Sequence, residues 1–140
     1  FPVPHEELEP VQYVYGDGNR RLGVLTDVGC STPHIETMLA GVDAMVLECN
    51  HDATMLENGP YPVSLKRRVG GRFGHLENAQ SAALLAKLMH DKLQCVMAAH
   101  VSRKNNTNAL AQGALAQVLN CTDDDVRVAC QTTGFDWITL

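Results

Sequence analysis

This sequence has few aromatic side chains, no long apolar run and no excess of basic charge. Aromatic residues make up 5% of the 140 positions, so any core must be mainly aliphatic. No apolar run approaches the roughly 20 residues of a transmembrane helix, and we expect no membrane partner. The net charge of −5 gives no general attraction for nucleic acid or anionic membranes. A hydrophobic content of 45% and a charged content of 19% are typical of a globular domain.

Paired cysteines are missing too. The chain has five cysteines, an odd number, and no two are spaced as Cys-x-x-Cys. Cys49, Cys95 and Cys130 lie in apolar runs that resemble strands. The pattern favours reduced, buried thiols in a cytoplasmic protein over a disulfide framework, and it does not fit a zinc finger.

The chain does contain alternating strand and helix patterns. A β-hairpin is predicted where two strand-like runs flank the turn Gly16-Asp17-Gly18-Asn19. Residues 53–62 are rich in glycine and proline and predict a loop with at most one helical turn. The strands are expected at 11–15, 20–26, 44–49, 93–99 and 126–131, with a further edge strand possible at 137–140, and the helices at 32–40, 63–69, 79–90 and 108–119. This alternation predicts an α/β layered fold, with a mixed sheet and flanking helices.

Polar residues follow the apolar strands where each strand ends. Asp27 follows the second strand, Asn50-His51-Asp52 the third, and His100 the fourth, while His5 precedes the first. In a layered α/β fold these ends gather at one edge, which is where such folds bind ligands. One carboxylate and two or three imidazoles suit zinc, manganese or iron. Each residue alone is equally well explained as an ordinary turn residue, because Asp is common in turns.

Five motifs, in order, give the chain a resemblance to a known family. Two of them resemble the bridging-aspartate and last-histidine motifs of the metallo-β-lactamase fold, and three resemble its YycJ/VicX-like (WalJ-like) branch of nuclease-like, metal-dependent hydrolases. The motifs are Leu25-Thr26-Asp27-Val28-Gly29, residues 98–107, Glu48-Cys49-Asn50-His51-Asp52, Asn58-Gly59-Pro60-Tyr61-Pro62 and Gly74-His75-Leu76-Glu77-Asn78.

The resemblance implies a site for two divalent metals, Zn²⁺ or Mn²⁺. It implies His5, Asp27 and His100 as metal ligands, with Asp27 bridging the metals. It also implies a catalytic His75 that donates to a phosphate oxygen. The metals would lower the pKa of a bound water, and the resulting hydroxide would attack phosphorus. The residues implied in substrate binding are His75, Asn50, His51, Asp52, Arg103 and Asn106.

One motif of this fold, His-x-His-x-Asp-His, does not occur in the sequence. We therefore expect residues 1–140 to be the C-terminal half of a metallo-β-lactamase αββα sandwich, inactive alone and partnered by a missing N-terminal half. The predicted function of the complete domain is a phosphodiesterase or exonuclease acting on nucleic acid. Two alternatives stay open: a hydrolase of a small ester or thioester, and a non-catalytic half-domain.

Overall fold

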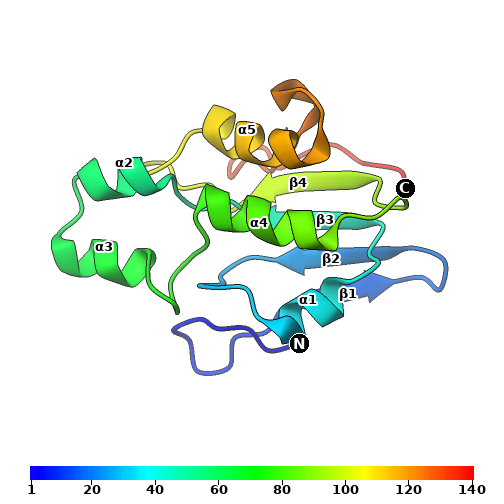
Figure 1. Cartoon of the computed structure of the whole chain (residues 1–140), viewed down its shortest axis with the longest axis horizontal. Coiled ribbons are helices and arrows are strands. Elements are labelled where there is room, and N and C mark those ends of the chain that lie inside the picture. Colours follow the sequence, from blue (N-terminus) through cyan, green and yellow to red (C-terminus); the bar gives the residue numbers. More distant parts are fainter.

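The computed structural model describes all 140 residues and is built around one five-stranded mixed sheet (Figure 1). The strands lie in the order β1-β2-β3-β4-β5. β1 is antiparallel to β2, and the other neighbours are parallel. The parallel strands therefore end at one edge of the sheet. The bounds are β1 Tyr13–Gly16, β2 Arg21–Leu25, β3 Ala44–Glu48, β4 Cys95–Ala99 and β5 Arg127–Val128.

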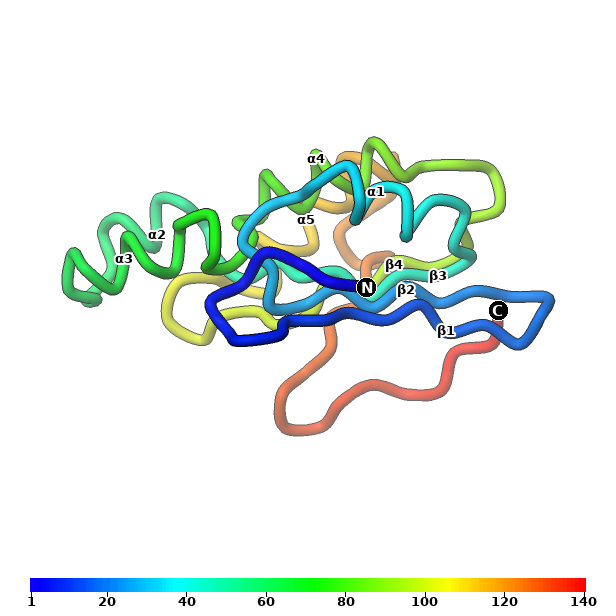
Figure 2. The backbone as a smooth tube through the Cα atoms, turned by 90° about the horizontal axis from the view of Figure 1, so that it is seen from below, coloured from blue at the N-terminus to red at the C-terminus, as the bar shows by residue number.

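Three helices cover one face of this sheet, and two more project past its edge. Figure 2 shows α1, α4 and α5 on one side of the strands, while in Figure 1 α2 and α3 extend beyond the ends of β2 to β4. None of the helices has the length and apolarity that crossing a bilayer requires. The bounds are α1 Pro33–Leu39, α2 Ala53–Asn58, α3 Val63–Val69, α4 Asn78–Leu88 and α5 Asn108–Leu119, followed by a 3₁₀ turn at Asp123–Asp125.

Local sequence explains where the covering helices begin. The Thr32 hydroxyl accepts from the Ile35 backbone N–H, and the Thr107 hydroxyl does the same for Leu110. Each satisfies one of the donors that a helix start leaves unpaired. Between sheet and helices lies a core of 19 buried residues, including Ile35 and Leu115. Complete burial of each such side chain contributes about 1.5–3 kcal/mol.

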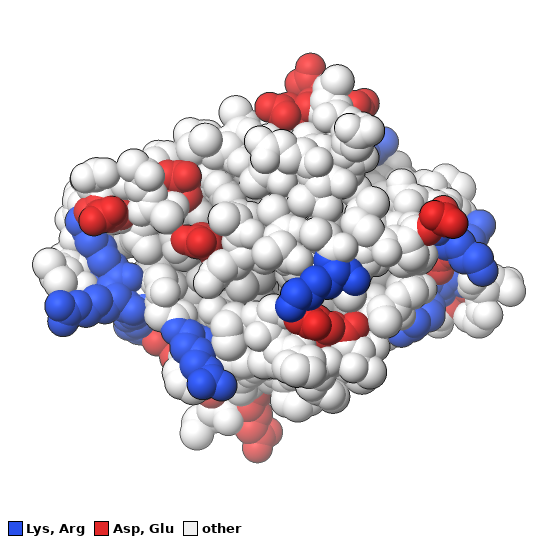
Figure 3. Space-filling view, viewed as in Figure 1, with Lys and Arg blue, Asp and Glu red and all other residues white.

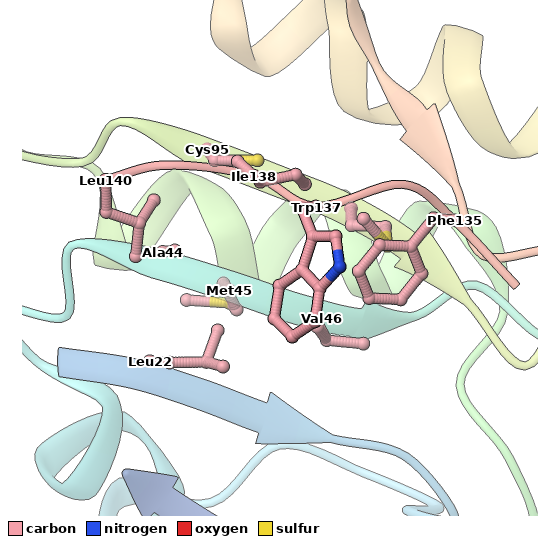
Figure 4. Close-up of a pocket in the computed structure, with 10 residues that line it drawn as sticks. Leu22, Ala44, Met45, Val46, Cys95, Phe135, Trp137, Ile138 and Leu140 are labelled. Carbon is pink, nitrogen blue, oxygen red and sulfur yellow. The ribbon is translucent and has the colours of Figure 1, made fainter. Parts of the chain in front are cut away.

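The opposite face of the sheet is covered only by the last residues of the chain. Leu22, Val46 and Met97 lie on this face, and residues 135–140 pass over it (Figure 4). Between them is a groove of about 430 Å³ in which every lining residue is hydrophobic. Trp137 is fully exposed although it borders this groove. This apolar face has far less cover than the helical face.

Most of the predicted elements are confirmed, with small shifts at their ends. The hairpin forms, and the helices start close to the predicted residues. The helical turn predicted around Met55-Leu56 in the loop 53–62 forms, but it is longer than expected because α2 spans Ala53–Asn58. Asp52 caps this helix by accepting from the Met55 N–H. This capping signal outweighed the turn signal of the glycine and prolines that follow.

The C-terminal region differs most from the prediction. The strand expected over 126–131 is reduced to two residues in β5, and no strand forms at 137–140. Cys49 is buried as expected, but Cys130 is exposed and Cys95 only partly buried. An edge strand that pairs with one neighbour for two residues gives its flanking side chains little cover.

Candidate metal centre

Three adjacent strands each deliver one acidic or imidazole side chain to the same edge of the sheet. Asp27 follows β2, Glu48 is the last residue of β3, and His100 directly follows β4. Asp27 and His100 have positive φ angles of 51° and 54°. This left-handed backbone is uncommon outside glycine, and it turns each residue out of its strand. Such outliers concentrate at functional sites.

The Asp27 carboxylate lies among three imidazoles. Its Oδ1 is 3.8 Å from His5 Nε2, 3.9 Å from His75 Nδ1 and 3.7 Å from His100 Nδ1. The rings of His5 and His75 are 5.1 Å apart, and those of His75 and His100 are 5.0 Å apart. The Asp27 side chain is 47% exposed, so the cluster is open to solvent on that side. One cation with bonds of about 2.0–2.2 Å could contact both Asp27 Oδ1 and His5 Nε2.

Glu48 lies directly behind this cluster, and its side chain is completely buried. Its Oε1 accepts from His100 Nδ1 at 2.6 Å and from His75 Nδ1 at 2.9 Å. Backbone N–H groups of Asp27, Val28 and Leu76 also donate to this carboxylate. Burial raises the pKa of Glu48, but the hydrogen bonds from His100 and His75 outweigh it and hold the pKa at about 2. Glu48 is therefore a fully engaged, ionised acceptor.

This network determines which imidazole nitrogens carry protons. An ionised carboxylate can only accept, so His75 and His100 must donate to Glu48 from Nδ1. Likewise His5 Nδ1 lies 2.9 Å from the Gly74 carbonyl oxygen and must donate to it. In its neutral form each ring then has a lone pair on Nε2. Imidazoles that bind metal are commonly oriented in this way by a carboxylate or carbonyl behind them.

The donor set fits a divalent cation. Single ligand atoms of Asp27, Glu48, His75 and His100 lie within 4.8 Å of one another. This group contains His75 but not His5, whereas the sequence prediction placed His5 among the ligands and gave His75 a catalytic role. Glu48 is the least available of the four because backbone and imidazole donors already surround its oxygens. Imidazole and carboxylate together suit zinc or manganese.

The other residues predicted from sequence to bind substrate occupy different environments. Arg103 is exposed beside the cluster. Asn50 donates to the His100 carbonyl, and Asp52 caps α2. Asn106 is buried and hydrogen bonds with Asn78 and the Cys49 carbonyl. His51 is buried, and its Nδ1 has no hydrogen-bond partner. The structure thus brings only Asn50 and Arg103 of these five next to His75 and His100, as lining of one groove.

That groove leads away from the imidazoles and has a volume of about 280 Å³. His75 and His100 line it, with Tyr61 and Arg103 further along. A second hollow of about 300 Å³ shares Arg103 and Gln131 with it and continues toward the start of α5. The two together form an open path with polar walls, in contrast to the apolar groove on the sheet.

Glu48 is the member of this cluster that the sequence prediction missed. In sequence it is one charged residue at the end of an otherwise apolar strand, Ala44–Glu48, and so resembles a solvated strand end. The sequence feature that could have identified Glu48 is its position two residues before the polar cluster Asn50-His51-Asp52. A carboxylate at the end of a strand buried on both faces is almost never fully buried unless it is paired. His100, at the end of the neighbouring strand, and His75, which follows a glycine turn, are its partners.

Comparison with known proteins places this geometry in a class. The chain has the fold of about half of a metallo-β-lactamase domain: it superimposes on the metallo-β-lactamase fold protein YhfI from Bacillus subtilis with a TM-score of 0.67 and 13% identity, covering 98% of this chain and 47% of that one. It is also similar in sequence to exodeoxyribonuclease YycJ of Bacillus anthracis, at 37% identity over 119 residues, 85% of this chain and 45% of that protein. Exodeoxyribonuclease WalJ of Streptococcus pneumoniae is 27% identical over 128 residues, 91% of this chain and 48% of that protein.

These similarities confirm the resemblance predicted from the sequence motifs. No family model matches the chain. The chain spans about half the length of the curated relatives it matches. Its five-stranded mixed sheet with flanking helices is likewise matched to about half of the structural neighbour.

Proposed function

We propose that this chain forms part of a metal-dependent phosphodiesterase that degrades DNA as an exonuclease. The observation that carries the proposal is the Asp27 carboxylate among three imidazoles, two of which are oriented by the buried Glu48. Two similar proteins are named exodeoxyribonucleases, which supports DNA as the substrate.

We assign Asp27, His5 and His100 as the metal ligands, with two Zn²⁺ or Mn²⁺ ions in the complete site. His5 and His100 present Nε2 because Nδ1 is occupied by the Gly74 carbonyl and by Glu48. Asp27 offers an anionic oxygen between these two rings. When bound, the ions supply an activated water and neutralise negative charge on the phosphoryl oxygens.

His75 has the catalytic role in this proposal. Glu48 accepts from its Nδ1, so the ring presents Nε2 on its other side. In this role His75 gives a proton to the leaving oxygen as the P–O bond breaks, and the Glu48 carboxylate behind it holds the ring in position. Arg103, on the wall of the same groove, can hold a phosphate of the substrate. Asp52 and Asn106 receive no substrate contact, because their polar atoms serve the fold.

The test uses the full-length protein and the variant Asp27→Ala. We expect wild type to digest a 5′-phosphorylated single-stranded DNA and to contain metal by elemental analysis. Asp27→Ala should lose both the metal and the activity. Asp91→Asn, which removes one exposed carboxylate far from the cluster, is the matched control and should behave as wild type.

Three outcomes separate the alternatives. Cleavage of a chromogenic p-nitrophenyl ester without digestion of DNA would replace the proposal by a small-ester hydrolase. Metal-free wild type without either activity would favour a non-catalytic half-domain. Normal turnover and metal content in Asp27→Ala would remove Asp27 from the site.

A further inference from the structure

A basic segment adjoins the metal centre although the chain as a whole is acidic. Residues 61–76 contain four of the eleven Lys and Arg residues and no Asp or Glu. We call residues 61–75, which comprise Tyr61, α3 and the loop to His75, the basic lobe. Figure 3 shows its cations gathered at the left end of the molecule, where α3 lies in Figure 1. A local positive surface on a chain of net charge −5 attracts a polyanion only at that place.

Two of the four cations in the lobe are free for a ligand. Arg68 forms an ion pair with Glu6, and Lys66 donates to the Glu57 carbonyl. Arg67 and Arg72 are exposed and form no ion pair. Arg103 is likewise exposed and unpaired, and it lines the groove beside His75 and His100, whereas Arg67 and Arg72 lie outside that groove.

Two aromatic rings lie among these cations. Tyr61 lines the groove together with His75 and His100, and Lys104 Nζ lies 5.6 Å from the centre of its ring. Phe73 is 56% exposed, with the Arg72 guanidinium 6.0 Å from its ring centre. Aromatic faces accompanied by cations are the usual platform on which proteins stack unpaired bases.

Backbone contacts fix the position of the basic lobe relative to the metal centre. The Gly74 carbonyl accepts from His5, and the His75 N–H donates to the Val69 carbonyl. Gly29, just after Asp27, packs so closely that a Cβ there would lie 2.2 Å from the Arg72 carbonyl oxygen. The distance from lobe to imidazoles is therefore set by backbone contacts.

We propose that the basic lobe guides a single strand of nucleic acid into the metal centre. The scissile phosphate lies at Asp27 and the imidazoles, the adjoining base stacks on Tyr61, and the following phosphates meet Arg67 and Arg72. A paired base has no free face for Tyr61, so the preferred substrate is single-stranded. This inference deepens the proposed nuclease function and rests on it.

Binding is measured in the full-length protein carrying Asp27→Ala, which stops turnover, with fluorescein-labelled dT20 and a 20-base-pair duplex as probes. Tyr61→Ala should weaken dT20 binding about 5- to 150-fold, the range for losing one stacked base, and Tyr61→Phe should retain it. Arg67→Ala with Arg72→Ala should lower the slope of log K against log salt by about 1.4 for the two lost contacts. The matched control, Lys92→Ala with Arg127→Ala, removes two exposed cations outside the basic lobe and should leave the slope unchanged.

Turnover in the wild-type background gives a second readout. In the lobe variants the rate on dT20 should fall at least tenfold relative to the rate on bis(p-nitrophenyl) phosphate, which has a single phosphate and so offers none to Arg67 or Arg72. Equal binding of dT20 by Tyr61→Ala and wild type, an unchanged salt slope, or tighter binding of the duplex would each overturn the inference. If wild type showed no metal-dependent phosphodiesterase activity, the proposed function would be refuted. The binding results would not be affected by that outcome, so the two failures can be told apart.

Discussion

Replacing Glu48 by Gln tests how the metal centre is organised. The two carboxylate oxygens accept from different donors: Oε2 from the backbone of Val28 and Leu76, and Oε1 from the two imidazoles and the Asp27 N–H. A Gln amide has one oxygen and one NH₂ group. Whichever way it turns, its NH₂ group faces donors, so the shape is kept and the hydrogen bonds are not.

Each orientation of the amide has a definite cost. With NH₂ toward Val28 and Leu76, two buried backbone donors lose their acceptor at about 1–3 kcal/mol each. The free energy of unfolding then falls by about 2–6 kcal/mol. With NH₂ toward His75 and His100, each ring can accept only by moving its proton to Nε2, which removes the lone pair that binds metal. Loss of such a supporting residue typically lowers metal affinity 10- to 100-fold.

The assay combines urea unfolding of the metal-free protein with zinc titration against a competing chelator. Asp91→Asn makes the same change of charge at an exposed position and should stay within about 0.5 kcal/mol of wild type. Glu48→Gln with wild-type stability and wild-type zinc affinity would refute the network described for Glu48. A loss of stability without a loss of affinity would show that the backbone contacts alone depend on the carboxylate.

Three further predictions follow from other parts of the structure. His75→Ala should lower hydrolysis and leave the metal content near normal, whereas loss of one metal equivalent would make His75 a ligand. At pH 7 iodoacetamide should alkylate Cys130 quickly and spare Cys49, because hydrogen bonds from Thr132 and Thr133 lower the pKa of the exposed Cys130 thiol to about 6, while burial raises that of Cys49 to about 12; equal rates at the two thiols would contradict this. Residues 1–140 produced alone should self-associate through the apolar sheet face, or copurify with the rest of the domain, and a monodisperse 15.2 kDa monomer by light scattering would count against that expectation.

The sequence predicted the positions of strands and helices well in segments where one pattern was strong. Apolar runs ending in polar residues located β2, β3 and β4, and parallel pairing then required Asp27 and His100 to lie at one edge. Among the histidines at this edge, His100 directly follows a strand, whereas the roles of His5 and His75 were implied by the family resemblance. The helix α2 was predicted as no more than one turn because Pro60 and Pro62 were given more weight than the Asp52 cap.

The environment of Glu48 could not be derived from sequence patterns alone. Its five donors come from three separate segments, and no spacing rule relates His75 to a strand end 27 residues earlier. Periodicity likewise gave no measure of how long β5 pairs with β4, because that depends on the path of the chain after Val128. Long-range polar contacts of this kind appear only when the chain is folded.

The three neighbouring strands that deliver Asp27, Glu48 and His100 have a consequence for how such a protein can diverge. Adjacent strands lie about 4.7–4.9 Å apart in any sheet, so the spacing of these three positions belongs to the scaffold and not to the loops. Tyr61 and Arg103 lie on connecting segments, which tolerate insertion and exchange. Substitution in those segments can redirect the protein to a new polymer or a small ester while the reactive groups keep their positions.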